Sequence, residues 1–182
     1  MNDSSPAASR TANLLGAAAL AIGERMLAAA TGVAGVSTSG SAALVRLVAE
    51  PGIGVTELGE RIGLSQPAAA RMMDSLAAHG LAERRPGTSG RSVAVHPTRK
   101  GRAAARRVLQ ARQGELGGLI ERLSPEERES LTNGLEKILD RLFDEVGSEY
   151  VLCRLCDTRL CLTEGQLCPV GQAALDRGGG SG

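Results

Sequence analysis

The chain has 182 residues, a formal net charge of +1 and two aromatic residues, Phe143 and Tyr150. This length allows one domain with a hydrophobic core, or one domain with an appendix. Because aromatic residues make up 1% of the chain, the core must be built from aliphatic side chains. That composition favours packed helices and argues against a β-sandwich or a β-barrel.

The near-neutral total hides an uneven distribution of charge. Residues 81–113 hold nine basic residues against one acidic residue, a net +8, whereas residues 114–150 hold ten acidic against four basic residues, a net −6. A basic block inside a near-neutral protein is typical of a surface that binds a polyanion. A solvated helix face gives the same pattern, so charge alone leaves both interpretations open.

The N-terminus carries no visible secretory signal, and residues 1–10 are expected to form a disordered tail. The apolar stretch that begins at Leu14 meets Glu24 and Arg25, too soon to span a bilayer. We therefore expect a cytoplasmic protein with no membrane partner. Helical spacing of apolar residues predicts a helix over about residues 11–30 and a shorter one over 42–49, with Ser41 as its N-cap.

Two short helices joined by a tight turn are predicted over residues 56–79. Thr56 is expected to cap the first helix, Gly63 to permit a left-handed turn, and Pro67 to stand in the first turn of the second helix. This is the helix-turn-helix arrangement, whose second helix enters the DNA major groove by its N-terminal residues. Small or hydrogen-bonding residues at the start of the second helix predict the face that contacts DNA. Gln66 and Arg71 are the candidates for hydrogen bonds to base edges. The face consists of Ser65, Gln66, Pro67, Ala68, Ala70 and Arg71.

Alternating residues predict two strands, over 81–85 and 92–96, joined by a loop rich in Pro, Gly and Ser. A β-hairpin directly after a helix-turn-helix is a wing. Arg84, Arg85 and Arg91 lie on this hairpin, where guanidinium groups reach phosphates or a narrow minor groove.

Two long helices are predicted to follow the wing. Thr98 caps the first, over about 99–123, and Ser124 with Glu127 forms a capping box that starts the second. A stripe on the second helix predicts a partner helix from another subunit, although packing within the chain is the alternative. The stripe consists of Leu131, Leu135, Ile138, Leu139, Leu142 and Val146.

Four segments carry a family resemblance: VTELGERIGLS (55–65), RMMDSL (71–76), GLAERR (80–85) and TRKGR (98–102). Through these segments the chain resembles the MarR family of bacterial regulators over residues 11–147. The resemblance implies a mainly α fold with a β-hairpin wing, in which a winged helix-turn-helix lobe at about 42–98 is flanked by dimerisation helices at about 11–30 and 99–147. It also implies a homodimer, a palindromic operator in double-stranded DNA, and release by a small-molecule effector or by oxidation. Family wings usually carry an Asp where this chain has Ser89.

All four cysteines lie in the C-terminal segment, residues 148–182, with the spacing C-x2-C-x4-C-x6-C. They are Cys153, Cys156, Cys161 and Cys168. Four thiolates suit a tetrahedral zinc ion, which we expect because the segment has few apolar residues to hold it together. An iron–sulfur cluster is the alternative cofactor, and reactive thiols that form reversible disulfides are a third interpretation.

The sequence thus predicts a DNA-binding transcriptional regulator, a homodimeric repressor released by a small ligand or by a metal or redox signal at the cysteines. The alternative is a metal-binding or redox-responsive interaction module that uses the winged helix as a scaffold. An enzyme is not expected, because no βαβ unit surrounds Cys153 as a thioredoxin-like enzyme requires, and no phosphate loop or Ser-His-Asp set is present.

Overall fold

Helices dominate the computed structural model, which describes residues 5–87 and 92–178. Its elements, in chain order, are α1 (Pro6–Ala34), α2 (Thr38–Ala49), α3 (Val55–Arg61), α4 (Gln66–Ala78), β1 (Ala82–Pro86), β2 (Val93–Pro97), α5 (Arg99–Ile120), α6 (Pro125–Val146), α7 (Glu149–Leu152), α8 (Thr158–Cys161), the 3-10 turn η1 (Thr163–Gly165) and α9 (Pro169–Asp176). Strands β1 and β2 pair antiparallel as a hairpin. The predicted fold class, mainly helical with a hairpin wing, is confirmed.

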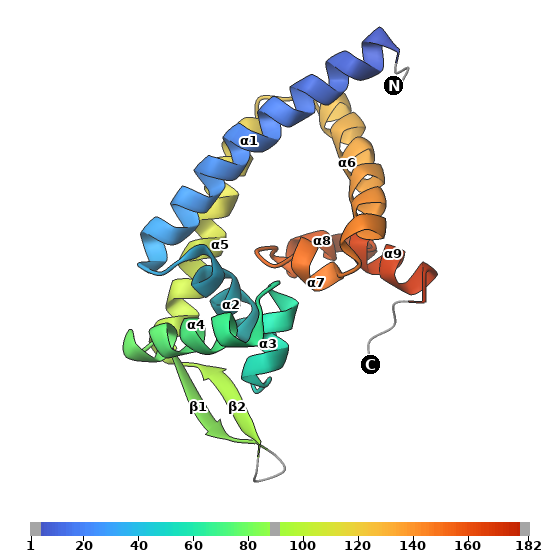
Figure 1. Ribbon diagram of the computed structural model, residues 1–182. Helices are drawn as coiled ribbons and strands as arrows, with labels where there is room; N and C mark the ends of the chain where they lie inside the picture. The colour runs from blue at the N-terminus through green and yellow to red at the C-terminus, as the bar shows by residue number, and fades with distance from the viewer. Residues whose placement is uncertain (1–4, 88–91, 179–182) are drawn as a thin grey trace.

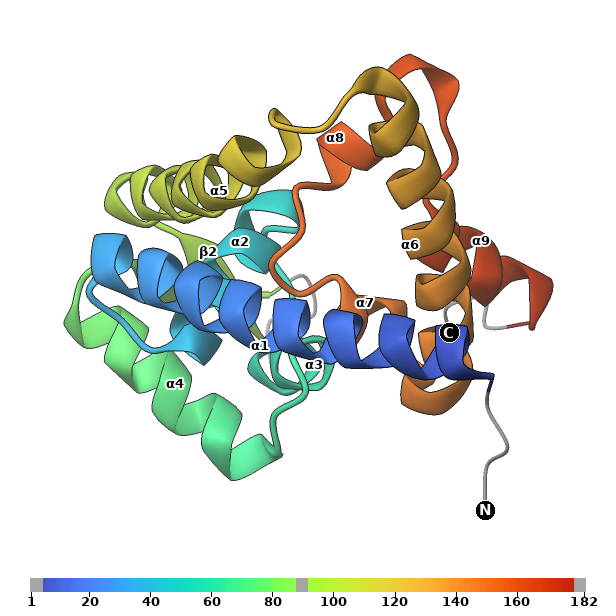
Figure 2. The same ribbon diagram turned by 90° about the horizontal axis from the view of Figure 1, so that it is seen from above.

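The elements form a winged-helix lobe, defined as α2, α3, α4, β1 and β2, with long helices leading away from it (Figure 1). Helices α1 and α5 pack along each other, and α6 returns from their far end toward the lobe. Helix α7 contacts α3, and α9 packs against α6. The view from above shows that this path leaves α6 well apart from α5 (Figure 2). The C-terminal segment therefore ends beside the lobe rather than extending into solvent.

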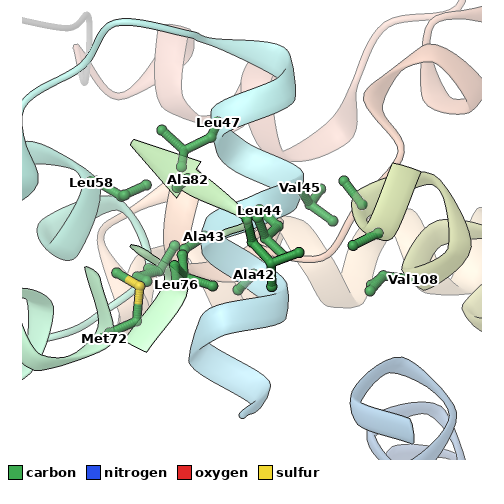
Figure 3. Packing of buried hydrophobic residues seen from close by; sticks show 14 of the residues in the cluster. Ala42, Ala43, Leu44, Val45, Leu47, Leu58, Met72, Leu76, Ala82 and Val108 are labelled. Atoms are coloured by element: carbon green, nitrogen blue, oxygen red, sulfur yellow. The ribbon is translucent and has the colours of Figure 1, made fainter. Parts of the chain in front are cut away.

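The core of the lobe is built from aliphatic side chains of every one of its helices (Figure 3). Leu44 of α2, Leu58 of α3 and Leu76 of α4 are fully buried, and Val108 of α5 joins them. Ser41 is also fully buried, and its hydroxyl donates to the carbonyl oxygen of Ala30 at 3.4 Å. The hydroxyl thus has the partner that a buried polar group needs.

Two glycines allow backbones to approach closely inside the lobe. A Cβ on Gly59 of α3 would stand 2.5 Å from the Cβ of Ala69 in α4. A Cβ on Gly101 of α5 would stand 1.8 Å from the carbonyl oxygen of Leu81, just before β1. Any larger residue at these positions would push α4 or the wing out of place.

Three predicted helix starts are wrong. Helix α1 begins at Pro6 rather than near residue 11, with Ser5 as its N-cap, so part of the expected tail is helical. Helix α2 is capped by Ser37, whose hydroxyl accepts from the Gly40 amide at 3.1 Å, and not by Ser41. Helix α3 begins after Gly54, which leaves Thr56 inside its first turn. Each helix extends to the earliest residue that its neighbours allow, and a serine or glycine farther upstream takes the cap position.

The other predicted end signals are confirmed. Gly63 adopts φ 75°, the left-handed conformation expected for the turn. Thr98 caps α5 through the Gly101 amide, and Ser124 and Glu127 form the capping box of α6. These signals are local, so sequence spacing suffices to find them.

Helix α1 leaves much of its apolar surface uncovered. Leu14, Leu15 and Leu20 are exposed, although Arg25 pairs with Glu115 of α5 at 2.7 Å. By length and composition alone, Pro6–Gly32 could cross a membrane, with a mean hydropathy of 1.4 over its window. The expectation that this stretch is too short to span therefore fails on length. A buried subunit interface would meet the same test, since its helices are equally apolar.

The predicted stripe on α6 is likewise uncovered, with the exception of Leu139. Leu131, Leu135, Ile138, Leu142 and Val146 are each more than a third exposed. Leu139 packs instead beside the buried Phe143, Val170 and Ala173, which form a second small core between α6 and α9. The alternative of packing within the chain thus holds for Leu139 and not for the other five residues of the stripe.

Candidate nucleic-acid interface

The second helix of the helix-turn-helix, α4, separates a buried face from an exposed one. Its buried residues are Ala69, Met72, Met73 and Leu76. The predicted contact residues lie on the opposite side: Ser65, Gln66, Pro67, Ala70 and Arg71 are exposed, and Ala68 is half-buried. Because the exposed side chains near the helix start are mostly small, duplex DNA can approach the backbone closely.

The turn before α4 is held by backbone contacts. The Leu64 amide donates to the Gly59 carbonyl oxygen at 2.8 Å, and Ser65 occupies the N-cap position with extended backbone. Ala69 fits against Gly59, so the two helices cross at close range. This packing fixes the direction in which the first turn of α4 points.

The wing presents its arginines from β1. Arg84 stands opposite Val95 in the hairpin, and its guanidinium pairs with the carboxylate of Asp74 on α4 at 2.7 Å. Arg85 pairs with Glu83. Arg91 and Ser89 lie outside the described residues, so the role assigned to Arg91 stays a prediction. The sequence did not predict Asp74 as the partner of Arg84, although an acidic residue on the exposed side of the second helix is a signal that the sequence contains.

Part of the basic block serves the structure of the lobe. The Lys100 ammonium donates to the His79 carbonyl oxygen at 2.9 Å, and Arg102 donates to the Pro97 carbonyl oxygen at 2.7 Å. Both side chains therefore tie α5 to the end of α4 and to the wing. The net charge of residues 81–113 therefore overstates the number of basic side chains that are available to bind a polyanion.

The C-terminal segment brings all four cysteines to one cavity of about 150 Å³, which Arg46 and Tyr150 also line. Each cysteine is a half-buried free thiol. The Sγ atoms of Cys156 and Cys161 are 3.8 Å apart, and the Cys168 sulfur accepts a hydrogen bond from the Gly171 amide at 3.4 Å. The four cysteines thus line a common space, and their assignment as metal ligands stays a prediction.

The thiols have unequal acidities. A hydrogen bond from the Cys156 thiol lowers the pKa of Cys153, and the same interaction, together with burial, raises the pKa of Cys156. Burial raises the pKa of Cys161. Burial also lowers the pKa of Arg46, against the opposing influence of Tyr150. Cys153 therefore ionises more readily than Cys156 or Cys161.

Tyr150 connects the cysteine segment to the lobe. The guanidinium carbons of Arg46 on α2 and Arg61 on α3 lie 4.8 Å and 4.4 Å from the centroid of its ring. Both arginines also form ion pairs with Glu50. Sequence reasoning missed this stack, because the three residues are far apart in the chain and no local spacing links them.

The sequence profile of the MarR family matches residues 41–93, which contain most of α2 and all of α3, α4 and β1. The chain contains a MarR-family domain. Its structural neighbours include RV1404 from Mycobacterium tuberculosis, at 27% identity and TM-score 0.63 over 82% of this chain and 99% of that one. The transcriptional repressor CouR bound to a 23-mer DNA duplex is 28% identical, with TM-score 0.56 over 69% of this chain and 89% of the other. YusO from Bacillus subtilis, at 23% identity, TM-score 0.63 and coverages of 74% and 97%, shares the fold. No curated protein matches the chain.

The MarR-family domain accounts for the winged-helix lobe and leaves the C-terminal cysteines unexplained. The profile ends at residue 93, whereas the first cysteine is Cys153. Within the domain, α4 and the wing are the elements that the sequence predicted to contact DNA. The chain has the fold of a MarR-family transcriptional regulator.

Proposed function

We propose that this protein is a cytoplasmic, homodimeric transcriptional repressor that binds a palindromic operator through α4 and the wing. The observation that carries the proposal is the exposed, small-residue face at the start of α4, beside a wing that carries Arg84 and Arg85. The similarity to CouR supports it, since CouR is a repressor whose structure contains a DNA duplex. Release of the operator by a small molecule remains a prediction for which no pocket is assigned.

The proposed contact residues fall into two groups. Gln66 and Arg71 lie on the exposed face of the first two turns of α4, where side chains reach base edges: Arg pairs with guanine and Gln with adenine. Arg84 lies on the wing, where its guanidinium group leaves the Asp74 carboxylate and binds a DNA phosphate instead. Base contacts then give sequence preference, and the wing gives affinity.

We expect Arg71→Ala to reduce the preference for operator over random DNA by about ten-fold or more, at a cost of about 1–3 kcal/mol in operator binding. Arg84→Ala should weaken binding to all sequences alike and flatten its dependence on salt. Fluorescence anisotropy with operator and scrambled duplexes across a salt series measures both effects. Arg122→Ala is the control, because the α5–α6 connection lies at the end of the molecule away from the wing (Figure 1).

Unchanged affinity in both variants would exclude α4 and the wing as the DNA interface. If the wild-type protein binds no DNA at any salt concentration, the interaction-module alternative replaces the repressor.

The exposed apolar surfaces support the homodimer. The α6 stripe and the leucines of α1 lie on the long helices that lead away from the lobe, and both are uncovered in the single chain. Contiguous exposed apolar surface of this kind marks an interface in a soluble protein. A second copy is the simplest partner, since a two-fold dimer presents two α4 helices to a palindrome.

Leu135→Glu should convert the dimer into a monomer, because it places a charge in the centre of the α6 stripe, where Leu135 is 42% exposed in the single chain. Analytical ultracentrifugation measures the change in mass. Asn133→Glu is the matched control, since Asn133 is exposed on the opposite side of the same helix. A dimer that persists in Leu135→Glu while Asn133→Glu dissociates would place the interface on the other face of α6.

A further inference from the structure

The four cysteines reach their common cavity from separate elements. Cys153 follows α7, Cys156 lies in the loop after it, Cys161 ends α8, and Cys168 caps the start of α9. The chain therefore folds back twice to bring four thiols together. Apolar packing does not account for this gathering, because the second small core involves only Cys153 and Cys168 at its edge.

The spacing of one pair matches a metal-binding geometry. Four thiolates arranged tetrahedrally at the usual zinc–sulfur distance are about 3.8 Å from one another, and the Cys156 and Cys161 sulfurs are separated by 3.8 Å. Among the described residues, no three Cys, His, Asp or Glu side chains stand close enough together to hold an ion in their present rotamers. Cys153 and Cys168 already line the same cavity, so rotation of their side chains would bring the remaining two sulfurs to the common point.

The charge around the cavity suits an anionic centre. Arg46, itself half-buried, lines the cavity and faces Cys153. Arg112 of α5 lines a neighbouring pocket together with Cys156 and Cys161. Four thiolates around a divalent ion carry a net charge of about −2, and the guanidinium group of Arg112 offsets part of that charge, whereas Arg46 is already paired with Glu50.

The structure assigns the four cysteines to one thiolate-ligated metal centre, a zinc ion or an iron–sulfur cluster, whose presence fixes the position of the helix-turn-helix. Each thiol that binds releases its proton to solvent. A zinc ion requires no other component, whereas a cluster requires iron and inorganic sulfide. The effect on DNA rests on the proposed function above, but the metal centre and its effect on the lobe do not.

The link to the helix-turn-helix runs through residues next to the ligands. Leu155, between Cys153 and Cys156, is 6% exposed and belongs to the core of the lobe. The Val151 side chain lies 3.6 Å from the point where a Cβ on Gly63, the turn glycine, would stand. Tyr150 is held by the arginines of α2 and α3. Ligation of Cys153 and Cys156 thus orders the loop that supports the turn before α4.

The first test is metal analysis of the full-length protein purified without oxygen. One zinc per chain and a colourless protein identify the single ion, whereas iron, acid-labile sulfide and a visible absorption band identify the cluster. Co²⁺ added to the chelator-treated protein should give the visible bands of tetrahedral thiolate ligation. These bands should be lost in Cys161→Ser and kept in Thr158→Ala, which lines the same cavity. A metal-free protein that binds neither Co²⁺ nor Zn²⁺ would overturn the assignment.

The second test compares metal-loaded and chelator-treated protein by hydrogen exchange. We expect amides of α3 and α4 to exchange at least about ten-fold faster without metal, and operator affinity to fall by a similar factor. In Tyr150→Ala, the metal should still bind but its removal should change the exchange of α3 and α4 much less. Equal exchange in the loaded and metal-free wild-type protein would refute the link. Altered exchange in a protein that binds no operator would refute the repressor and leave this inference standing.

Discussion

Replacement of Gly101 by alanine is expected to unfold much of the protein or to lower its free energy of unfolding by about 3 kcal/mol or more. The added Cβ would stand 1.8 Å from the Leu81 carbonyl oxygen and 3.4 Å from the Leu44 side chain. The obstacle is backbone, and the Leu81 oxygen also accepts hydrogen bonds from Thr98. Either α5 or the start of the wing must shift, and both carry core residues. Urea unfolding monitored by circular dichroism measures the loss.

Gly114→Ala in the same helix is the matched control. A Cβ at Gly114 meets nothing within 4 Å, so this variant should be as stable as the wild type or gain up to about 1 kcal/mol from helix propensity. Equal stability of the two variants would show that α5 does not approach the wing as closely as described.

Leu155→Ala is expected to lower the free energy of unfolding by about 2–5 kcal/mol, because it leaves a cavity in the core of the winged-helix lobe. This effect is notable for a residue in a segment that composition marks as an appendix. Thermal unfolding followed by circular dichroism at 222 nm, a standard helix wavelength, should show one cooperative transition at a lower temperature.

Leu167→Ala provides the comparison within the same segment, since Leu167 is 71% exposed. It should change stability by less than about 0.5 kcal/mol. If both leucine variants match the wild type, the C-terminal segment does not share the core of the lobe.

The helix-turn-helix could be predicted from sequence because its signals lie within a few residues of one another. Gly63 must take a left-handed conformation, Ser65 stands at a cap, and Pro67 fits a first helical turn. The same local reasoning placed the starts of α5 and α6. It failed at Ser41, because Ser37 offers an equally good cap one turn earlier and the apolar helix continues back to it.

The exposed face of α4 was also found from periodicity, but the partners of the wing arginines were not. Arg84 meets Asp74 across ten residues, and that contact depends on the angle between hairpin and helix. The stack of Tyr150 on Arg46 and Arg61 depends on the return path of α6. Such contacts are set by tertiary packing, which leaves no periodic signal in the chain.

Tyr150, which lies beside two arginines, also provides an optical probe. Tyr150 is the one tyrosine of the chain, and tryptophan is absent. Its emission under ultraviolet excitation therefore comes from a single ring that lies within 5 Å of two guanidinium groups. Detachment of α7 from α2 and α3 would move that ring into water, so its quantum yield and its quenching by iodide report docking of the segment in unlabelled protein. The chain thus contains its own fluorophore at the junction between the cysteines and the helix-turn-helix.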